Sequence, residues 1–131
     1  MTHGNNATVL IVDDDQGIRQ GLKALLETAG YQAVCAEDGW KALELLRAGL
    51  VPRCVVLDLM MPKLNGWDFM QELVNDARLP RIPNIVATAA APHWGFPVPD
   101  AHVLRKPLDI DRLLDLIGAV TTTPGSPPMV A

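Results

Sequence analysis

Short apolar runs alternate along the chain with longer stretches in which apolar residues recur at helical spacing. Five such runs stand at residues 8–12, 32–36, 54–57, 84–88 and 101–104, of which the second is weak and the fifth is short. The strongest runs are continuously apolar, which is typical of strands that are covered on both faces of a sheet. We therefore predict five strands.

Four other stretches place their apolar residues on one stripe of a helix. Glycines or prolines follow the first three stretches, where they would end a helix. Strands that alternate with helices of this length predict βαβ units and a parallel sheet, and right-handed crossovers then give a three-layer α/β sandwich. The four stripes are Ile18, Leu22, Leu25 and Leu26; Ala42, Leu43, Leu45 and Leu46; Trp67, Met70, Leu73 and Val74; and Ile110, Leu113, Leu114 and Ile117.

The alternation of strands and helices is interrupted between the fourth and fifth predicted strands. Residues 89–100 contain three prolines and Gly95, so we expect a loop or one irregular turn there rather than a regular helix. For the whole chain we expect a disordered N-terminus at 1–7, one folded domain at 8–120 and a flexible Pro-rich tail at 121–131.

Composition narrows the class of protein. With 131 residues, 49% of them hydrophobic, the chain is expected to bury a core of its own. A net charge of −4 weighs against direct binding of nucleic acid. Cys35 and Cys54 lie in apolar runs and are expected to be reduced packing residues. The sequence has no apolar run of membrane-spanning length and no signal-peptide pattern, so we expect a cytoplasmic protein without membrane contact.

Polar residues gather where the predicted strands end. Asp13 and Asp14 follow the first strand, Asp58 follows the third, Thr88 ends the fourth and Lys106 follows the fifth. The carboxyl ends of parallel strands open on one edge of a sheet, which is where ligands bind in doubly wound folds. These five side chains should therefore converge on one site.

The residue types in this group favour one kind of chemistry. Clustered carboxylates repel one another unless a cation joins them, and Mg²⁺ takes one or two protein carboxylates while leaving positions for phosphate oxygens. A carboxylate can also act as a nucleophile and form an aspartyl-phosphate. A lysine and a threonine hydroxyl would contact the transferred group. The pattern predicts Mg²⁺-assisted phosphoryl transfer.

Several segments together resemble the receiver domain of response regulators in two-component signal transduction. They occur in the family's order, and the resemblance runs from about residue 8 to residue 120. It implies a flavodoxin-like, doubly wound five-stranded parallel sheet in the order 2-1-3-4-5. The family's fourth helix, which would lie between the predicted strands at 84–88 and 101–104, is expected to be degraded or absent in this chain. The segments are LIVDDD at 10–15, VLDLMMP at 56–62, NGWDF at 65–69, ATA at 87–89 and KP at 106–107.

The resemblance assigns roles around the phosphoryl group. Asp58 corresponds to the phosphoacceptor, and Thr88 and Lys106 correspond to the residues that contact the phosphoryl group. The bond between Lys106 and Pro107 corresponds to a peptide bond that is usually cis in the family. The donor would be a histidine kinase or a phosphotransfer protein of a phosphorelay, and the chain would be a switch rather than an enzyme.

The resemblance also assigns a metal site. Asp13, Asp14 and Asp58 correspond to the side chains that hold Mg²⁺, and the backbone carbonyl of Met60 corresponds to a further metal contact. Asp15 matches no ligand and is expected to favour the start of the first helix, where an acid suits the helix dipole. The downstream target is not indicated, and a homodimer is compatible with the resemblance.

Taken singly, these residues have ordinary explanations. Adjacent acids can cap a helix, an acid after a strand can belong to a turn, and a lysine is most often surface charge. Only their joint placement favours the functional interpretation. Trp40 and Trp67 are interpreted as packing residues, and Asp38 with Gly39 as a turn before the second helix. The three histidines have no acidic or cysteine neighbours at ligand spacing, so no metal is assigned to them.

The sequence departs from the family at the positions that accompany activation. Val103 stands where most receivers have Tyr or Phe, three residues before the lysine, and the neighbouring His102 is a candidate substitute. Met60 and Ala90 occupy two positions thought to tune dephosphorylation in the family. Met60 would not orient a water, and Ala90 would not block one.

Three functions therefore remain open from the sequence. The first is a phosphorylation switch. The second is a pseudo-receiver that keeps the fold as a protein–protein interaction module without phosphorylation, which Val103 and the altered fourth helix favour. The third is a Mg²⁺-dependent phosphohydrolase. It would need a general acid two places after the nucleophile, and Met60, which stands there, cannot serve as one.

Overall fold

The computed structural model describes residues 7–59, 61, 63–79, 81–89 and 102–121. These residues form five strands and four helices that alternate as the sequence predicts up to β4. The strands are β1 (Thr8–Val12), β2 (Gln32–Ala36), β3 (Cys54–Asp58), β4 (Asn84–Thr88) and β5 (Val103–Arg105). The helices are α1 (Gln16–Thr28), α2 (Gly39–Arg47), α3 (Gly66–Asn75) and α4 (Ile110–Thr121).

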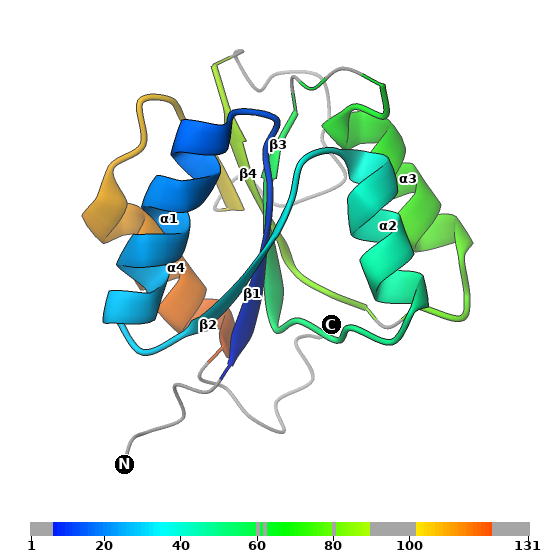
Figure 1. Ribbon diagram of the computed structural model, residues 1–131, viewed down its shortest axis with the longest axis horizontal. Helices are drawn as coiled ribbons and strands as arrows, with labels where there is room; N and C mark the ends of the chain where they lie inside the picture. The colour runs from blue at the N-terminus through cyan, green and yellow to red at the C-terminus, as the bar shows by residue number, and fades with distance from the viewer. Residues whose placement is uncertain (1–6, 60, 62, 80, 90–101, 122–131) are drawn as a thin grey trace.

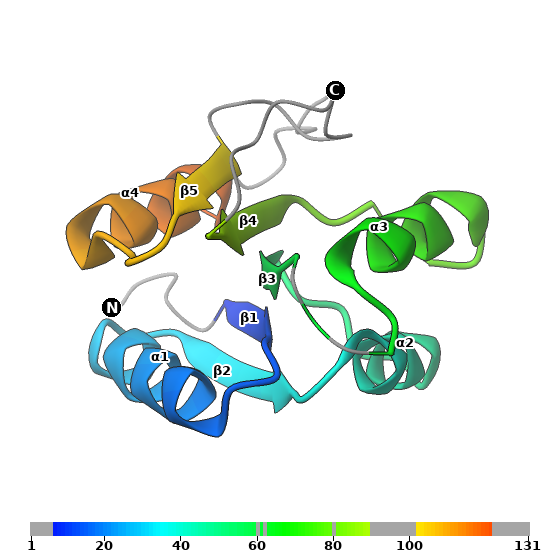
Figure 2. The same ribbon diagram turned by 90° about the horizontal axis from the view of Figure 1, so that it is seen from above.

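All five strands pair in parallel in the order β2-β1-β3-β4-β5, which confirms the predicted topology. Helices α1 and α4 cover one face of the sheet, and α2 and α3 cover the other (Figure 1). Seen from above, the sheet is the middle of three layers (Figure 2). The chain is thus a doubly wound α/β sandwich.

The central strands are buried on both faces, which explains their continuous apolar character. Along β1, Leu10 and Val12 pack toward α2 and α3, whereas Val9 and Ile11 pack toward α1 and α4. None of these four side chains has measurable exposure to solvent. Burying a side chain of this size contributes about 1.5–3 kcal/mol. The alternation therefore fixes the register of β1, because a shift by one residue would exchange the two faces.

Short polar side chains begin all four described helices, at Asp15, Asp38, Asn65 and Asp109. The carboxylate of Asp15 accepts a hydrogen bond from the backbone N–H of Ile18 at the start of α1, as expected for this acid. Asp38 caps α2 in the same way. The predicted turn at residues 38 and 39 therefore included one residue of the helix, because Gly39 already belongs to α2.

The predicted helical stripes are correct in their centres and wrong at some edges. Leu25 is 39% exposed and Val74 is 72% exposed, although both were placed on buried stripes. Trp40 is 53% exposed, so its interpretation as a packing residue was wrong. At 3.6 residues per turn, Trp40 lies on the same side of α2 as the exposed Glu44 and Arg47. Trp67, in contrast, packs against the core.

The last strand lies later than expected. The prediction was 101–104, whereas β5 spans Val103–Arg105 and His102 belongs to a preceding 3-10 turn. The peptide bond between Lys106 and Pro107 is cis, which confirms that expectation. The predicted irregular segment at 89–100 and both expected termini, apart from Ala7 and Thr121, fall almost entirely outside the described residues. Among the described residues, no helix is long and apolar enough to cross a membrane.

Candidate functional site

The register of the sheet brings four strand ends together. Val12 is paired with Leu57, so Asp13 and Asp58 each come one residue after that pair. Asp58 is paired with Ala87, and Thr88 follows on β4. The next pair joins Thr88 to Arg105, so that Lys106 emerges beside it at the end of β5. The backbone N–H of Lys106 donates to the carbonyl of Thr88 at 2.9 Å, which fixes this last position.

Three carboxylates converge at this edge of the sheet. Asp13, Asp14 and Asp58 each have an oxygen that lies within 4.8 Å of the corresponding oxygens of the other two. Asp13 and Asp58 are buried, with 4% and 5% exposure, whereas Asp14 is exposed. Hard cations such as Mg²⁺ prefer oxygen ligands, and an exposed carboxylate beside two buried ones leaves an approach for the ion and its waters. The donor set fits the predicted metal.

Lys106 is the cation of this group. Its ammonium nitrogen lies 3.2 Å from Asp13 Oδ2 and 3.5 Å from Asp58 Oδ2. Partial burial acts to lower the pKa of Lys106, but the attraction of Asp13 and Asp58 and the hydrogen bonds to them outweigh it, so its pKa is raised. The lysine therefore stays charged next to the carboxylates and offsets part of their repulsion.

Asp13 is held by both its backbone and its side chain. Its backbone N–H donates to Ala36 at 3.2 Å, and its carbonyl accepts from Arg19 Nη1 at 2.8 Å. Its Oδ1 accepts from the N–H of Asp15 at 2.9 Å, and its Oδ2 accepts from Lys106. Every polar atom of Asp13 thus has a partner. The contact with Arg19 was not predicted, because an arginine six residues along the chain carries no sequence signal of its own.

The remaining predicted site residues are placed only in part. Thr88 is fully buried at the end of β4. Met60 and Ala90 lie outside the described residues, so the predicted metal contact of Met60 stays a prediction. Val103 is half-buried and packs against the core on the α2 and α3 side of the sheet, and His102 is also half-buried.

A glycine beside the site was missed as a functional position. The N–H of Gly66 donates to the carbonyl of Leu59 at 3.1 Å, which brings the start of α3 onto the backbone that follows Asp58. A Cβ at Gly66 would lie 2.9 Å from the carbonyl oxygen of Asp58 and 2.8 Å from the Cα of Leu59. The signal was visible as Asn65-Gly66, since Asn65 caps α3 and only glycine permits this approach.

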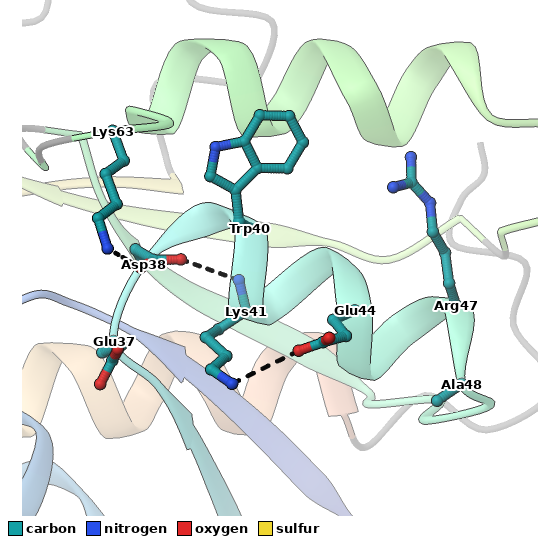
Figure 3. A pocket seen from close by; sticks show the side chains of 8 residues that line it. All are labelled: Glu37, Asp38, Trp40, Lys41, Glu44, Arg47, Ala48 and Lys63. Atoms are coloured by element: carbon teal, nitrogen blue, oxygen red, sulfur yellow. Dashed lines mark hydrogen bonds and ion pairs between the residues drawn. The ribbon is translucent and has the colours of Figure 1, made fainter.

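A hollow lies along α2, and its lining includes none of Asp13, Asp14 and Asp58 (Figure 3). Its volume is about 710 Å³, and Trp40 lies on its wall. Lys63 pairs with Asp38 at 3.6 Å, and Lys41 pairs with Glu44 at 3.6 Å. Because these four charges are already paired within the chain, they are not free to converge on a small-molecule ligand.

Comparison with known proteins agrees with the geometry of the strand ends. The family model of the response regulator receiver domain matches residues 9–118, which is most of the chain. The chain belongs to the response regulator receiver domain family. As a receiver domain, it is part of the two-component signalling machinery, whose response regulators work with histidine kinases or phosphotransfer proteins.

Individual relatives support this membership. Protein PilH of Pseudomonas aeruginosa is 36% identical over 118 residues, which cover 87% of this receiver and 97% of PilH. The DNA-binding dual master transcriptional regulator RpaA of Synechocystis is 35% identical over 116 residues, which cover 86% of this receiver but 48% of RpaA. The chain therefore spans nearly the whole length of PilH and about half the length of RpaA.

Solved structures show the same fold. The receiver domain of the Francisella response regulator 1452 superposes with a TM-score of 0.78 at 29% identity, covering 88% of this chain and 97% of that domain. The chemotaxis protein CheY4 of Vibrio cholerae has a TM-score of 0.76 at 27% identity, covering 87% of this chain and 98% of that chain. This receiver thus shares the fold of these domains and covers nearly their whole length.

Proposed function

We propose that this receiver accepts a phosphoryl group on Asp58 in a Mg²⁺-dependent reaction, with a histidine kinase or a phosphotransfer protein as donor. The observation that carries the proposal is the convergence of Asp13, Asp14 and Asp58 within 4.8 Å, with Lys106 against two of them. A single one of these residues would have an ordinary structural explanation. Together they supply a nucleophile, ion ligands and a cation for phosphate.

The chemical step follows from these roles. A carboxylate oxygen of Asp58 attacks the phosphorus of a phosphohistidine, so that an O–P bond forms while the P–N bond breaks and the imidazole nitrogen leaves with the electron pair. Asp13 and Asp14 would hold Mg²⁺, which neutralises charge on the transferring oxygens when it is bound. The burial of Asp58 keeps competing water from most of its surface.

Lys106 and Thr88 would then contact the phosphoryl group on Asp58. In the unmodified protein, Lys106 Nζ is within 3.5 Å of Asp58 Oδ2, so it needs to move little to contact a phosphoryl oxygen on the same residue. The hydroxyl of Thr88, on the neighbouring strand, would donate to a second phosphoryl oxygen. Contacts made only in the phosphorylated state favour one of two conformations, which is how such a switch transmits a signal.

The pseudo-receiver alternative is less well supported. A module that is never phosphorylated gains nothing from three mutually repelling carboxylates at one edge of the sheet, since their proximity costs stability. Val103 in place of the usual aromatic residue alters how the signal passes from the site, and it leaves the residues of the acidic group intact. The two functions differ in whether Asp58 is modified, and that difference can be measured.

Acetyl phosphate can serve as a small-molecule phosphoryl donor in the test. The full chain is incubated with acetyl phosphate and Mg²⁺, and covalent phosphate is measured by intact mass spectrometry. We expect one phosphoryl group per chain. It should not form when Mg²⁺ is chelated before the donor is added, and it should not form in Asp58→Asn. The matched control is Asp68→Asn, which changes an exposed acid in the first turn of α3 and should keep full labelling. No labelling of the wild-type chain would indicate a pseudo-receiver, and rapid turnover of phosphate esters a hydrolase.

A further inference from the structure

Arg19 connects the first helix to the end of the first strand. It lies in the first turn of α1, where its backbone N–H donates to the carbonyl of Asp15 at 3.0 Å. Its side chain turns back past the helix start, and Nη1 donates to the carbonyl oxygen of Asp13 at 2.8 Å. The residue is half-buried, so water competes with this bond less than it would on an open surface.

The bond constrains the peptide that joins two of the acids. The carbonyl of Asp13 and the N–H of Asp14 belong to one planar unit, so holding the oxygen fixes the orientation of the whole plane. Asp13 has additional restraints, because its carboxylate is bonded to the N–H of Asp15 and to Lys106. Asp14 has no hydrogen bond or ion pair among the described residues, so the position from which its carboxylate reaches toward the ion is set by the backbone, and no other described side chain restrains it.

The donor of this hydrogen bond is the positively charged guanidinium of Arg19. Hydrogen bonds from a charged donor are shorter and roughly twice as strong as neutral ones, which agrees with the 2.8 Å distance. The group also places a positive charge 2.8 Å from the backbone carbonyl of Asp13, in addition to the charge of Lys106. A neutral side chain of similar length could reproduce neither effect.

We propose that Arg19 is a positioning residue for the metal site: it fixes the Asp13–Asp14 peptide so that both carboxylates face the ion. The inference rests on the proposed function, because it assigns Arg19 a part in the binding of Mg²⁺. Residues that orient metal ligands typically change metal affinity by about 10- to 100-fold when they are replaced. Since the restraint acts on binding, it should affect the Mg²⁺ dependence of labelling rather than its maximal rate.

The test compares Arg19→Gln and Arg19→Lys with the wild-type full chain, using Arg81→Gln as a matched control at an exposed position. The dissociation constant for Mg²⁺ is measured by isothermal titration calorimetry on the unphosphorylated proteins. We expect Arg19→Gln to raise it by about 10-fold or more, Arg19→Lys to raise it less but by more than twofold, and Arg81→Gln to leave it within twofold. Labelling by acetyl phosphate should slow at low Mg²⁺ in Arg19→Gln and recover at saturating Mg²⁺.

Two results would overturn the inference while leaving the proposed function in place. One is a folded Arg19→Gln whose dissociation constant for Mg²⁺ stays within twofold of the wild type. The other is a labelling rate that remains low at saturating Mg²⁺, which would indicate a general structural role. If Arg19→Gln does not fold, as judged by urea unfolding, Arg19→Lys decides by the same twofold criterion. A wild-type chain that binds no Mg²⁺ would overturn both proposals.

Discussion

Lys106 and Asp13 are 93 residues apart in the chain, and their side chains meet at 3.2 Å. They extend from the ends of β5 and β1, which are separated in the sheet by β3 and β4. The contact therefore depends on correct assembly of four strands. It also gives the site a cation without any metal, which allows the carboxylates to be buried before an ion binds.

Lys106 should make the stability of the protein depend on pH in the alkaline range. Its pKa is raised in the folded state because the attraction of Asp13 and Asp58 outweighs the opposite effect of burial. A raised pKa contributes stability that is fully present below the unfolded value of about 10.4 and is lost as the pH rises through the folded value. We expect the difference in free energy of unfolding between wild type and Lys106→Met to shrink above that pH, as measured by urea unfolding from pH 8 to 11.

The control for this pH dependence is Lys23→Met, which changes an exposed lysine on α1. The difference between wild type and this variant should stay nearly constant over the same range. If the Lys106→Met difference were equally constant, the ion pairs of Lys106 would contribute nothing to the folded state.

Mg²⁺ should stabilise the folded protein through the three acids. A ligand that binds only the folded state at 100 times its dissociation constant adds about 2.7 kcal/mol to the free energy of unfolding. We expect Mg²⁺ to raise the melting temperature of the wild type, and to raise it far less in Asp13→Asn. Asp58→Asn should melt at a higher temperature than the wild type without Mg²⁺, because it removes one of three repelling charges. Melting temperatures are followed by differential scanning calorimetry. Equal responses to Mg²⁺ in the wild type and Asp13→Asn would place the ion elsewhere.

Gly66 should be sensitive to the smallest substitution. In Gly66→Ala, the new Cβ would lie within 3 Å of the backbone of Asp58 and Leu59, and neither can move without shifting the acceptor. We expect a loss of about 1–3 kcal/mol in the free energy of unfolding, together with slower labelling. Gly21→Ala is the matched control, because a Cβ there meets nothing within 4 Å and should stabilise α1 by about 0.5–1 kcal/mol. Similar effects of the two changes in urea unfolding would contradict the close approach.

The two described tryptophans should differ in their contribution to stability. Trp40 is 53% exposed, so Trp40→Ala is expected to change the free energy of unfolding by less than about 1 kcal/mol. Trp67 packs against the core, so Trp67→Ala should cost about 3 kcal/mol. Chemical denaturation of the two variants checks the difference. A larger cost at Trp40 would mean that the outer side of α2 is covered.

The exposure of Trp40 illustrates what the sequence could not predict. An amphipathic pattern indicates which side of a helix is apolar, but a large residue at its edge is placed by the neighbouring elements. Here Ala42, Leu43 and Leu46 already fill the contact with the sheet. The same limitation affects Val74, which lies beyond the buried Phe69 and Met70 in α3. The strands were easier to predict, because a run that is apolar on both faces has one stable position, the interior of a covered sheet.

The acidic site was predictable for a similar topological reason. In a parallel sheet, residues at successive strand ends meet at one edge, so Asp13, Asp58 and Lys106 could be brought together without knowing any distance. The supporting contacts were not predictable. Arg19 reaches a backbone carbonyl, which leaves no pattern in the sequence. Asn65-Gly66 marks the start of α3, but it does not show how closely Gly66 approaches the backbone of Asp58.

The most direct test of the account is to identify the modified residue. The wild-type chain is labelled with acetyl phosphate and Mg²⁺, the acyl phosphate is reduced with borohydride, and peptides are sequenced by mass spectrometry. We expect one reduced residue, at position 58, formed only when Mg²⁺ is present and absent from Asp58→Asn. Modification at Asp13 or Asp14 instead, or equal modification without Mg²⁺, would contradict it.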